Sequence, residues 1–276
     1  MIHTMNFNKA NIKNQGKRKH MKVVSWNLNS IRARLEHVTN WIEEHKPDII
    51  CLQETKVRDE EFPKDVFENM GLNVYTHGQA AYNGVAFISP HKLEDVQKGF
   101  PEGDMNDQKR VISCTLNGVR IINVYIPQGD NPDSPKYAMK GAFYHRLREW
   151  MEDDFTPESD VLICGDFNIA PKDVDVHDVT KCSKKCGYLP EEVTWLNYLM
   201  SWGFDDSFRL IHPEKKQFSW WDYRMKSYDN NKGMRIDHIL TSNGLSKKVI
   251  DAGVEESPRA LERPSDHVPV FTVFKL

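Results

Sequence analysis

The sequence has no uninterrupted apolar run near the roughly 18 residues that a membrane-spanning helix needs, and its mean hydropathy is negative. A membrane span is therefore excluded. The chain also lacks the charged start, apolar run and small-residue cleavage site of a secretory signal. Its 276 residues include only five cysteines, an odd number, so we expect free thiols in a reducing cytosol and no disulfide framework.

An excess of positive charge is missing as well. The formal net charge is -3, and residues 1–20 hold five basic side chains and no acid, which leaves about -8 for the remainder. Overall charge therefore gives no sign of a basic face for nucleic acid. An acidic body is compatible with a cation site built from several carboxylates, beside local Lys and Arg contacts.

The chain divides into a short extension and one large domain. Residues 1–20 are polar, rich in Asn and Lys, and show no hydrophobic periodicity, whereas a strand-like segment starts directly after Met21. We expect residues 1–20 to form a disordered basic tail. Residues 21–276, in a chain with 39% hydrophobic and 11% aromatic residues, are enough for one sizeable core, and we expect them to form a single domain.

Strand patterns outnumber helix patterns along the domain. Apolar residues recur at helical spacing from Ile31 to Ile42, and an apolar run resumes after Pro47 as a strand. The pattern predicts an α/β fold, a four-layered α/β sandwich in which two packed mixed β-sheets are flanked by helices. The predicted strands are 23–26, 49–52, 85–89, 111–116, 120–125, 160–164, 218–221, 235–240 and 268–274, and further helices are predicted at 137–151 and 190–202.

Nearly every predicted strand runs directly into acidic, amide, Tyr or His side chains. Loops after strands are where α/β folds build their sites. A single acid at a strand end is more often a turn or cap residue, so the set as a whole carries the indication. The segments are Trp26-Asn27, Gln53-Glu54-Thr55-Lys56, Asn123-Val124-Tyr125-Ile126-Pro127, Gly165-Asp166-Phe167-Asn168, Arg235-Ile236-Asp237 and Ser265-Asp266-His267.

These six segments, in this order, resemble the motifs of the endonuclease/exonuclease/phosphatase superfamily, and the resemblance covers residues 21–276. The segment 218–224 (Phe-Ser-Trp-Trp-Asp-Tyr-Arg) and the turn 189–192 (Leu-Pro-Glu-Glu) resemble its exonuclease III, or abasic-site endonuclease, branch. The resemblance implies a DNA-repair phosphodiesterase of the exodeoxyribonuclease III type. Such an enzyme cleaves DNA 5′ of abasic sites and removes nucleotides or blocking groups from 3′ ends of duplex DNA by metal-dependent hydrolysis.

Phosphodiester hydrolysis requires neutralised charge, a deprotonated water and a stabilised leaving oxyanion. The sequence suggests no Cys-His or Ser-His-Asp arrangement, so we expect direct attack by water with a hard metal ion. Mg²⁺ prefers one or two carboxylates together with water and substrate phosphate. The resemblance implies that Glu54 is the principal ligand of one or two Mg²⁺ or Mn²⁺ ions. The other residues implied at the metal are Asn27, Asp166, Asn168, Asp266 and His267, with Asn29 close by.

The resemblance also implies the catalytic groups. Asp166 and Asn168 match the pair that orients or deprotonates the attacking water. Asp237 matches the carboxylate that holds the imidazole of His267 toward the phosphate, and Tyr125 matches a hydroxyl that contacts the phosphate. The division of roles stays open, because the same atoms can serve one metal ion or two.

Several of the implied substrate-binding residues also have a purely structural interpretation. Trp220, Met234 and Ile236 match the wall of a pocket for a flipped-out abasic sugar, although ordinary core packing is the alternative. Lys56 either touches phosphate or sits beside Glu54, or it belongs to the solvated surface. The full implied set is Asn29, Lys56, Gln128, Trp220, Met234 and Ile236.

Other functions fit parts of the pattern. A lipid or inositol phosphate hydrolase on the same scaffold shares several motifs, and a catalytically inactive nucleic-acid-binding module is opposed by the complete set of competent residues. His177, Cys182 and Cys186 are three potential zinc ligands in one loop with no second Cys pair, and we interpret them as free side chains. The expected partner is double-stranded DNA with abasic sites or 3′ ends, bound by a monomer in the bacterial cytosol, with no membrane involved.

Overall fold

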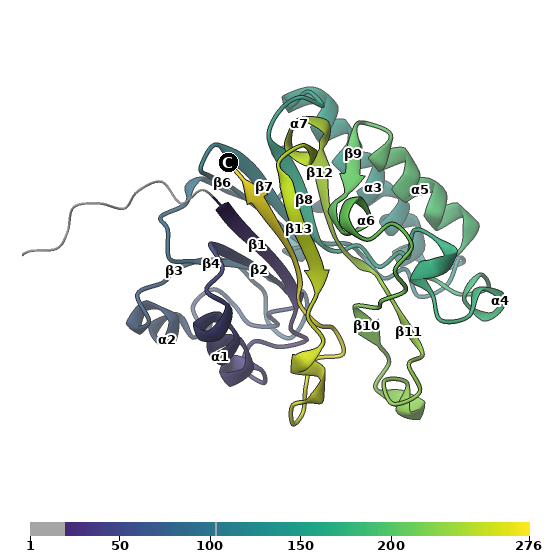
Figure 1. Cartoon of the computed structure of the whole chain (residues 1–276), viewed down its shortest axis with the longest axis horizontal. Coiled ribbons are helices and arrows are strands. Elements are labelled where there is room, and N and C mark those ends of the chain that lie inside the picture. Colours follow the sequence, from purple (N-terminus) through teal and green to yellow (C-terminus); the bar gives the residue numbers. More distant parts are fainter. Residues whose placement is uncertain (1–19, 103) are drawn as a thin grey trace, which may run out of the picture.

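A computed structural model describes residues 20–102 and 104–276, and it contains two six-stranded sheets. Figure 1 shows the sheets packed together, with α1 and α2 on one outer side and α3 and α5 on the other. The first sheet has the order β13 (Val249–Val254), β14 (Val270–Lys275), β1 (His20–Asn27), β2 (Ile49–Gln53), β4 (Val85–Ser89) and β3 (Asn73–His77). The second has the order β5 (Glu94–Lys98), β6 (Val111–Leu116), β7 (Val119–Tyr125), β8 (Val161–Asp166), β12 (Asp237–Ser242) and β9 (Phe204–Asp206).

The remaining regular elements lie outside the two sheets. The short strands β10 and β11 form an antiparallel pair of their own, in which Trp220 lies opposite Met234. Among the described residues, no helix is both long enough and apolar enough to cross a bilayer. These elements are β10 (Trp220–Trp221), β11 (Gly233–Met234), α1 (Leu35–His45), α2 (Lys64–Asn69), α3 (Pro135–Asp154), α4 (Val179–Cys182), α5 (Pro190–Met200), α6 (Ser207–Ile211) and α7 (Asn243–Ser246).

Successive residues of a strand point to opposite faces, and here both faces of each sheet are covered. On β1, Val23 packs between the two sheets, whereas its neighbour Val24 packs with Trp41 of α1. On β7, Ile121 packs between the sheets and Ile122 packs toward α3. The result is four layers, helix–sheet–sheet–helix, which confirms the predicted fold class.

The strand directions bring many chain ends to one edge of the sandwich. β1 is parallel to β2, and β7 is parallel to β8. β14 runs antiparallel to β1, and β12 runs antiparallel to β8. Within each sheet, the carboxyl ends of the parallel pair therefore lie beside the amino end of an antiparallel neighbour. The polar segments of the sequence are attached to these ends.

Eight of the nine predicted strands correspond to the interior strands of the two six-stranded sheets. Five strands were not predicted from the sequence. Four of them, β13, β3, β5 and β9, are the edge strands of the six-stranded sheets, and the fifth is the short strand β11. The predicted strand 218–221 is shorter, because only Trp220–Trp221 pairs as β10. β1 begins at His20, one residue before the expected start of the domain, and residues 1–19 of the expected tail lie outside the described residues.

Gly165 lets β7 and β8 approach closely just before the polar segment that follows β8. Its φ is +143°, and an added Cβ would lie 1.9 Å from the carbonyl oxygen of Val124. Gly118 also has a positive φ, +80°, but an added Cβ would meet nothing within 4 Å. A comparison of alanine substitutions at the two positions therefore separates the cost of a positive φ from the cost of steric overlap.

We expect Gly118→Ala to lower the free energy of unfolding by about 1 kcal/mol, the usual cost of a left-handed alanine. Gly165→Ala should cost at least ~2 kcal/mol more, because overlap with backbone cannot be relieved by a side-chain rotation. Urea unfolding followed by circular dichroism measures both losses. Equal losses in the two variants would contradict the close approach of β7 and β8.

Candidate active site

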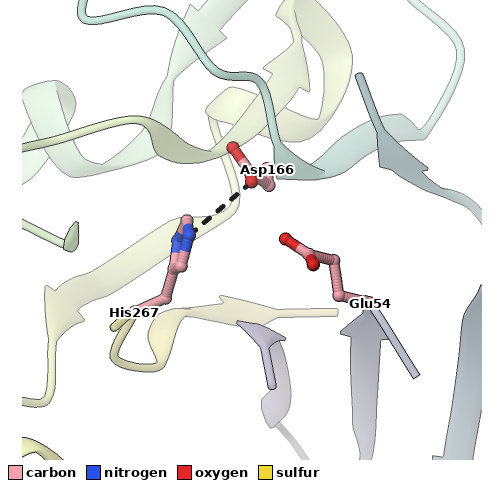
Figure 2. Close-up of side chains that lie close together, drawn as sticks. All are labelled: Glu54, Asp166 and His267. Atoms are coloured by element: carbon pink, nitrogen blue, oxygen red, sulfur yellow. Dashed lines mark ion pairs between the residues drawn. The ribbon is translucent and has the colours of Figure 1, made fainter. Parts of the chain in front are cut away.

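Three side chains from both sheets meet at this edge. Glu54 directly follows β2, Asp166 ends β8, and His267 precedes β14. One potential ligand atom from each lies within 4.8 Å of the other two, and Figure 2 shows the side chains converging. Asp166 and His267 are buried and Glu54 is partly exposed, so the cluster opens toward solvent on the side of Glu54.

The amide of Asn27 joins the two carboxylates. Its Nδ2 donates to Glu54 Oε1 at 2.9 Å and to Asp166 Oδ2 at 3.0 Å. Its Oδ1 accepts from the backbone N–H of Asn29 at 3.0 Å, which fixes the orientation of the amide. Because Asn27 ends β1 and Asp166 ends β8, this side chain bridges the first sheet and the second at the site.

The environment makes Asp166 an unusually basic carboxylate. Burial raises its pKa, the charge of His267 opposes that rise, and the charges of Asp237 and Glu54 add to it, giving about 7. The Asp166 Oδ2 atom lies 3.8 Å from His267 Nε2. A carboxylate with a pKa near 7 can accept a proton at neutral pH, which is the property of a general base.

His267 is held as a cation. Burial alone would lower its pKa, but the charges of Asp237 and Asp166 outweigh burial and raise the pKa to about 10. Its Nδ1 lies 2.9 Å from Asp237 Oδ2, and the same oxygen accepts from Ser219 Oγ at 2.6 Å. Asp237 therefore fixes the ring and leaves Nε2 as a donor directed toward Asp166 and the cavity.

Tyr125 is kept as a neutral phenol at the end of β7. Burial raises its pKa well above the ordinary value, and the charges of Glu54 and Asp166 raise it further. The guanidinium of Arg110 lies 4.6 Å from the centre of its ring and donates to its backbone carbonyl at 3.1 Å. Tyr125 can therefore donate a hydrogen bond into the cavity without losing its proton.

Asn168 and Gln128 lie on two neighbouring loops of the cavity. The backbone N–H of Asn168 donates to Asp166 Oδ1 at 2.9 Å, and its side-chain amide donates to Ile126 O at 2.9 Å. Asn168 has a φ of +54°, in the left-handed region. Both Asn168 and Gln128 line the cavity.

Asp266 and Lys56 lie beside the cluster of three. The two oxygens of Asp266 accept from Asn29 Nδ2 at 3.0 Å and from Trp220 Nε1 at 3.1 Å. Lys56 Nζ lies 2.8 Å from Glu54 Oε2 and 2.5 Å from Asn29 Oδ1. Lys56 therefore lies beside Glu54, and a contact of its ammonium group with phosphate stays a prediction.

A cavity of about 460 Å³ connects this polar cluster to an apolar wall. Trp220, Met234 and Ile236 line the cavity, and Met234 and Ile236 are 8% and 5% exposed. The same three side chains pack against the small core cluster that contains Ala170 and Val176. Each of the three side chains therefore has one face in the cavity and another in the core, and their role as the wall of a pocket for an abasic sugar stays a prediction.

Residues 24–267 match the Endonuclease/Exonuclease/phosphatase family. The chain belongs to this family. Its relatives include the exodeoxyribonuclease III of Haemophilus influenzae, which is 40% identical over 92% of this chain and 100% of its own length.

Two solved members of the family have the same fold. An AP endonuclease from Archaeoglobus fulgidus has a TM-score of 0.90 and 36% identity, covering 93% of this chain and 100% of its own. The Neisseria 3′ phosphatase NExo, in a structure bound to product DNA hairpin, has a TM-score of 0.89 and 39% identity, with the same two coverages.

The loop with potential zinc ligands does not gather three of them. His177 Nδ1 lies 3.7 Å from Cys182 Sγ, whereas Cys186 lines the cavity. Across residues 20–102 and 104–276, the cluster of Glu54, Asp166 and His267 is the one group of three or more acidic, His or Cys side chains near enough to share an ion. All five cysteines are free thiols.

Two cations beside the site were not anticipated from sequence, and one of them, Lys140, is fully buried. Arg110 supports Tyr125, and Lys140 of α3 donates to the backbone carbonyl of Asn168 at 2.8 Å. Lys and Arg are usually exposed, and no local pattern distinguishes Arg110 from a surface residue. The predicted helix 137–151 did indicate that Lys140 faces inward, since Lys140 lies on the same buried face as Tyr137 and Tyr144.

The charge of His267 can be tested without catalysis. In metal-free protein, NMR titration should show its imidazole protonated up to about pH 10. Asp237→Asn removes the largest charge that favours the cation, so the pKa should fall by about 1 to 3 units. The spectrum of His267→Gln assigns the signal. A wild-type imidazole that loses its proton near 6.5, or an unchanged titration in Asp237→Asn, would contradict the assigned pairing.

Proposed function

We propose that this protein is a DNA-repair nuclease of the exodeoxyribonuclease III type, which cuts DNA 5′ of abasic sites and removes nucleotides or blocking groups from 3′ ends. The observation that carries the proposal is the shared cavity in which Glu54, Asp166 and His267 face an apolar wall. Extrusion of an abasic sugar costs least because no base has to be unstacked, and a tight apolar wall then excludes sugars that still carry a base. The relatives from Haemophilus, Archaeoglobus and Neisseria support the same activity.

The donor set fits a hard divalent cation. Two carboxylates within reach of one another, one of them partly exposed, are typical of Mg²⁺ or Mn²⁺ sites that also use water and substrate phosphate. We infer that Glu54 and Asp166 hold one ion, and that protonated His267 is a hydrogen-bond donor beside it. When bound, such an ion neutralises phosphate charge and stabilises the charge that develops on the oxygens. Asn27 would orient both carboxylates through its amide.

The protein side chains would divide the chemistry as follows. Asp166 accepts the proton of the attacking water, because burial and the charges of Asp237 and Glu54 favour its protonated form. His267 donates from Nε2 to a phosphate oxygen while Asp237 compensates its charge. The amide of Asn168 and the phenol of Tyr125 donate to the phosphate, and the Tyr125 position near the cluster suits the leaving oxygen.

We also infer that the enzyme works as a monomer in the bacterial cytosol. The five free cysteines fit a reducing compartment. Contacts to duplex DNA beyond the cavity would come from local Lys and Arg side chains, since the net charge is -3.

The test is incubation with a duplex oligonucleotide that carries one tetrahydrofuran abasic analogue, in Mg²⁺ or in EDTA. We expect a single cut at the analogue in Mg²⁺ and none in EDTA. Cleavage under both conditions would overturn the metal requirement, and cleavage under neither would overturn the proposed activity.

Asp166→Asn should leave the fold intact and lower turnover at the abasic analogue by at least ~10²-fold, because it removes the base and preserves the shape. Asp160→Asn is the matched control, since Asp160 precedes the opposite end of β8 and pairs with Lys248 on the surface. Thermal unfolding and single-turnover kinetics are measured for both. A loss below tenfold in folded Asp166→Asn would place the base elsewhere.

Substitutions at Trp220 test the apolar wall. Trp220→Ala should reduce the preference for abasic over intact duplex more than it changes Mg²⁺ dependence, because an enlarged pocket no longer excludes a base. Trp220→Phe keeps an aromatic wall but removes the hydrogen bond to Asp266, so it should retain the preference. Both substrates are compared at fixed salt. An equal loss on the two substrates in Trp220→Ala would show that Trp220 serves only as packing.

A further inference from the structure

Lys140 is a charged side chain buried directly behind the cavity. It lies on α3, its side chain is 0% exposed, and its Nζ has three acceptors. These are Asn168 O at 2.8 Å, Gln128 O at 3.1 Å and Glu192 Oε1 at 2.5 Å. An ammonium group has three N–H donors, so every donor of Lys140 has a partner. Two of the partners are the backbone of loops that line the cavity.

Glu192 continues the connection to the other side of the cavity. Its Oε2 accepts from the backbone N–H of Gly187 at 2.6 Å and of Leu189 at 3.0 Å. Gly187 lines the cavity and lies against Met234, so that an added Cβ would be 3.3 Å from Met234 Cε. Its carbonyl accepts from Ala170 N at 2.8 Å. The ion pair therefore contacts the loop of Asn168 and the turn that supports the apolar wall.

Packing alone does not account for this pair. Removing two charges from water is costly, and apolar side chains of similar volume often stabilise a core equally well or better. Asn168 adopts a left-handed conformation, which persists only when surrounding contacts hold it. The carbonyl of Asn168 receives such a contact from Lys140, and the remaining bonds of the pair all go to backbone around the cavity.

We propose that Lys140 and Glu192 are a positioning pair of the nuclease reaction, which fixes Asn168 against the reacting phosphate and Gly187 against the pocket wall at the same time. The proposal rests on the proposed function for its catalytic meaning. Neither side chain reaches the cavity, so both act through the groups they hold. The pair links the rate of hydrolysis to the discrimination of abasic sugars.

The decisive variant is the double substitution Lys140→Met/Glu192→Gln. Lys140→Met alone leaves Glu192 buried without its cation, which is strongly destabilising. The double variant contains no unpaired buried charge, and the new side-chain amide at position 192 still offers an oxygen to Gly187 and Leu189. Its unfolding temperature should return close to that of the wild type, while Asn168 and Gln128 remain without the ammonium donor.

We expect kcat at the abasic analogue to stay at least ~tenfold below the wild type in the double variant, because small misplacements of a reacting group are that costly. The Mg²⁺ concentration for half-maximal activity should not change. Arg148→Met is the matched control, since Arg148 also joins α3 to α5, through Tyr198 O at 2.8 Å and Ser201 Oγ at 2.9 Å, away from the cavity. Its kcat should equal that of the wild type.

Recovery of kcat together with stability in the double variant would overturn the proposal, as would an equal loss in Arg148→Met. The amide hydrogen–deuterium exchange rate of residues 166–170 measures how firmly the loop of Asn168 is held, and it requires no catalysis. Faster exchange there in the double variant, with slow exchange retained elsewhere in the chain, supports the pair's role even if the wild type cuts no abasic duplex. Unchanged exchange overturns it. Failure of the wild type to cut concerns the proposed function alone.

Discussion

At one edge of the sandwich, the carboxylates of Glu54 and Asp166 lie beside the imidazolium of His267. The surrounding side chains are arranged around the balance of these three charges. Glu54 and Asp166 would repel each other at this separation, and burial strengthens the repulsion. The Asn27 amide donates to both, Lys56 pairs with Glu54, and His267 stands beside Asp166. The compensation is incomplete, since burial and the charges of Asp237 and Glu54 still raise the pKa of Asp166. A hard cation between the two carboxylates would complete it, which is why we regard the site as a metal site.

The fold supplies the positions for this balance. One parallel strand pair in each sheet, with an antiparallel neighbour, directs six chain ends to the same edge of the sandwich. The interior strands were predictable, because burial on both faces leaves continuous apolar runs such as 49–52. The edge strands were not, because they need no such run. β5, with the sequence Glu-Asp-Val-Gln-Lys, has exposed residues at both ends and resembles a loop in composition.

The residues of the site likewise divide into those that could be predicted from the sequence and those that could not. Residues at strand ends, such as Glu54 and Asp166, could be singled out because acids and amides that repeatedly follow apolar runs are a pattern of the sequence, and the family resemblance then implied their roles. Lys140 could not, because its burial depends on α5 packing beside α3 and on Glu192 of that helix, 52 residues away. The wider metal set, which includes Asn27 and Asp266, stays a prediction. Asn27 turns its amide N–H groups toward the carboxylates, and both oxygens of Asp266 are engaged by Asn29 and Trp220.

The central claim is that Glu54 and Asp166 form one cation site on which hydrolysis depends. Mn²⁺ binding followed by electron paramagnetic resonance tests it most directly, in the wild type, in Glu54→Gln and in the exposed control Glu60→Gln. The account predicts one site in the wild type and in Glu60→Gln, and an affinity at least ~tenfold lower in Glu54→Gln, because an amide lacks the charge that holds a hard cation. The Mn²⁺ concentration for half-maximal cleavage should rise in parallel. Equal affinity in all three proteins would contradict the account.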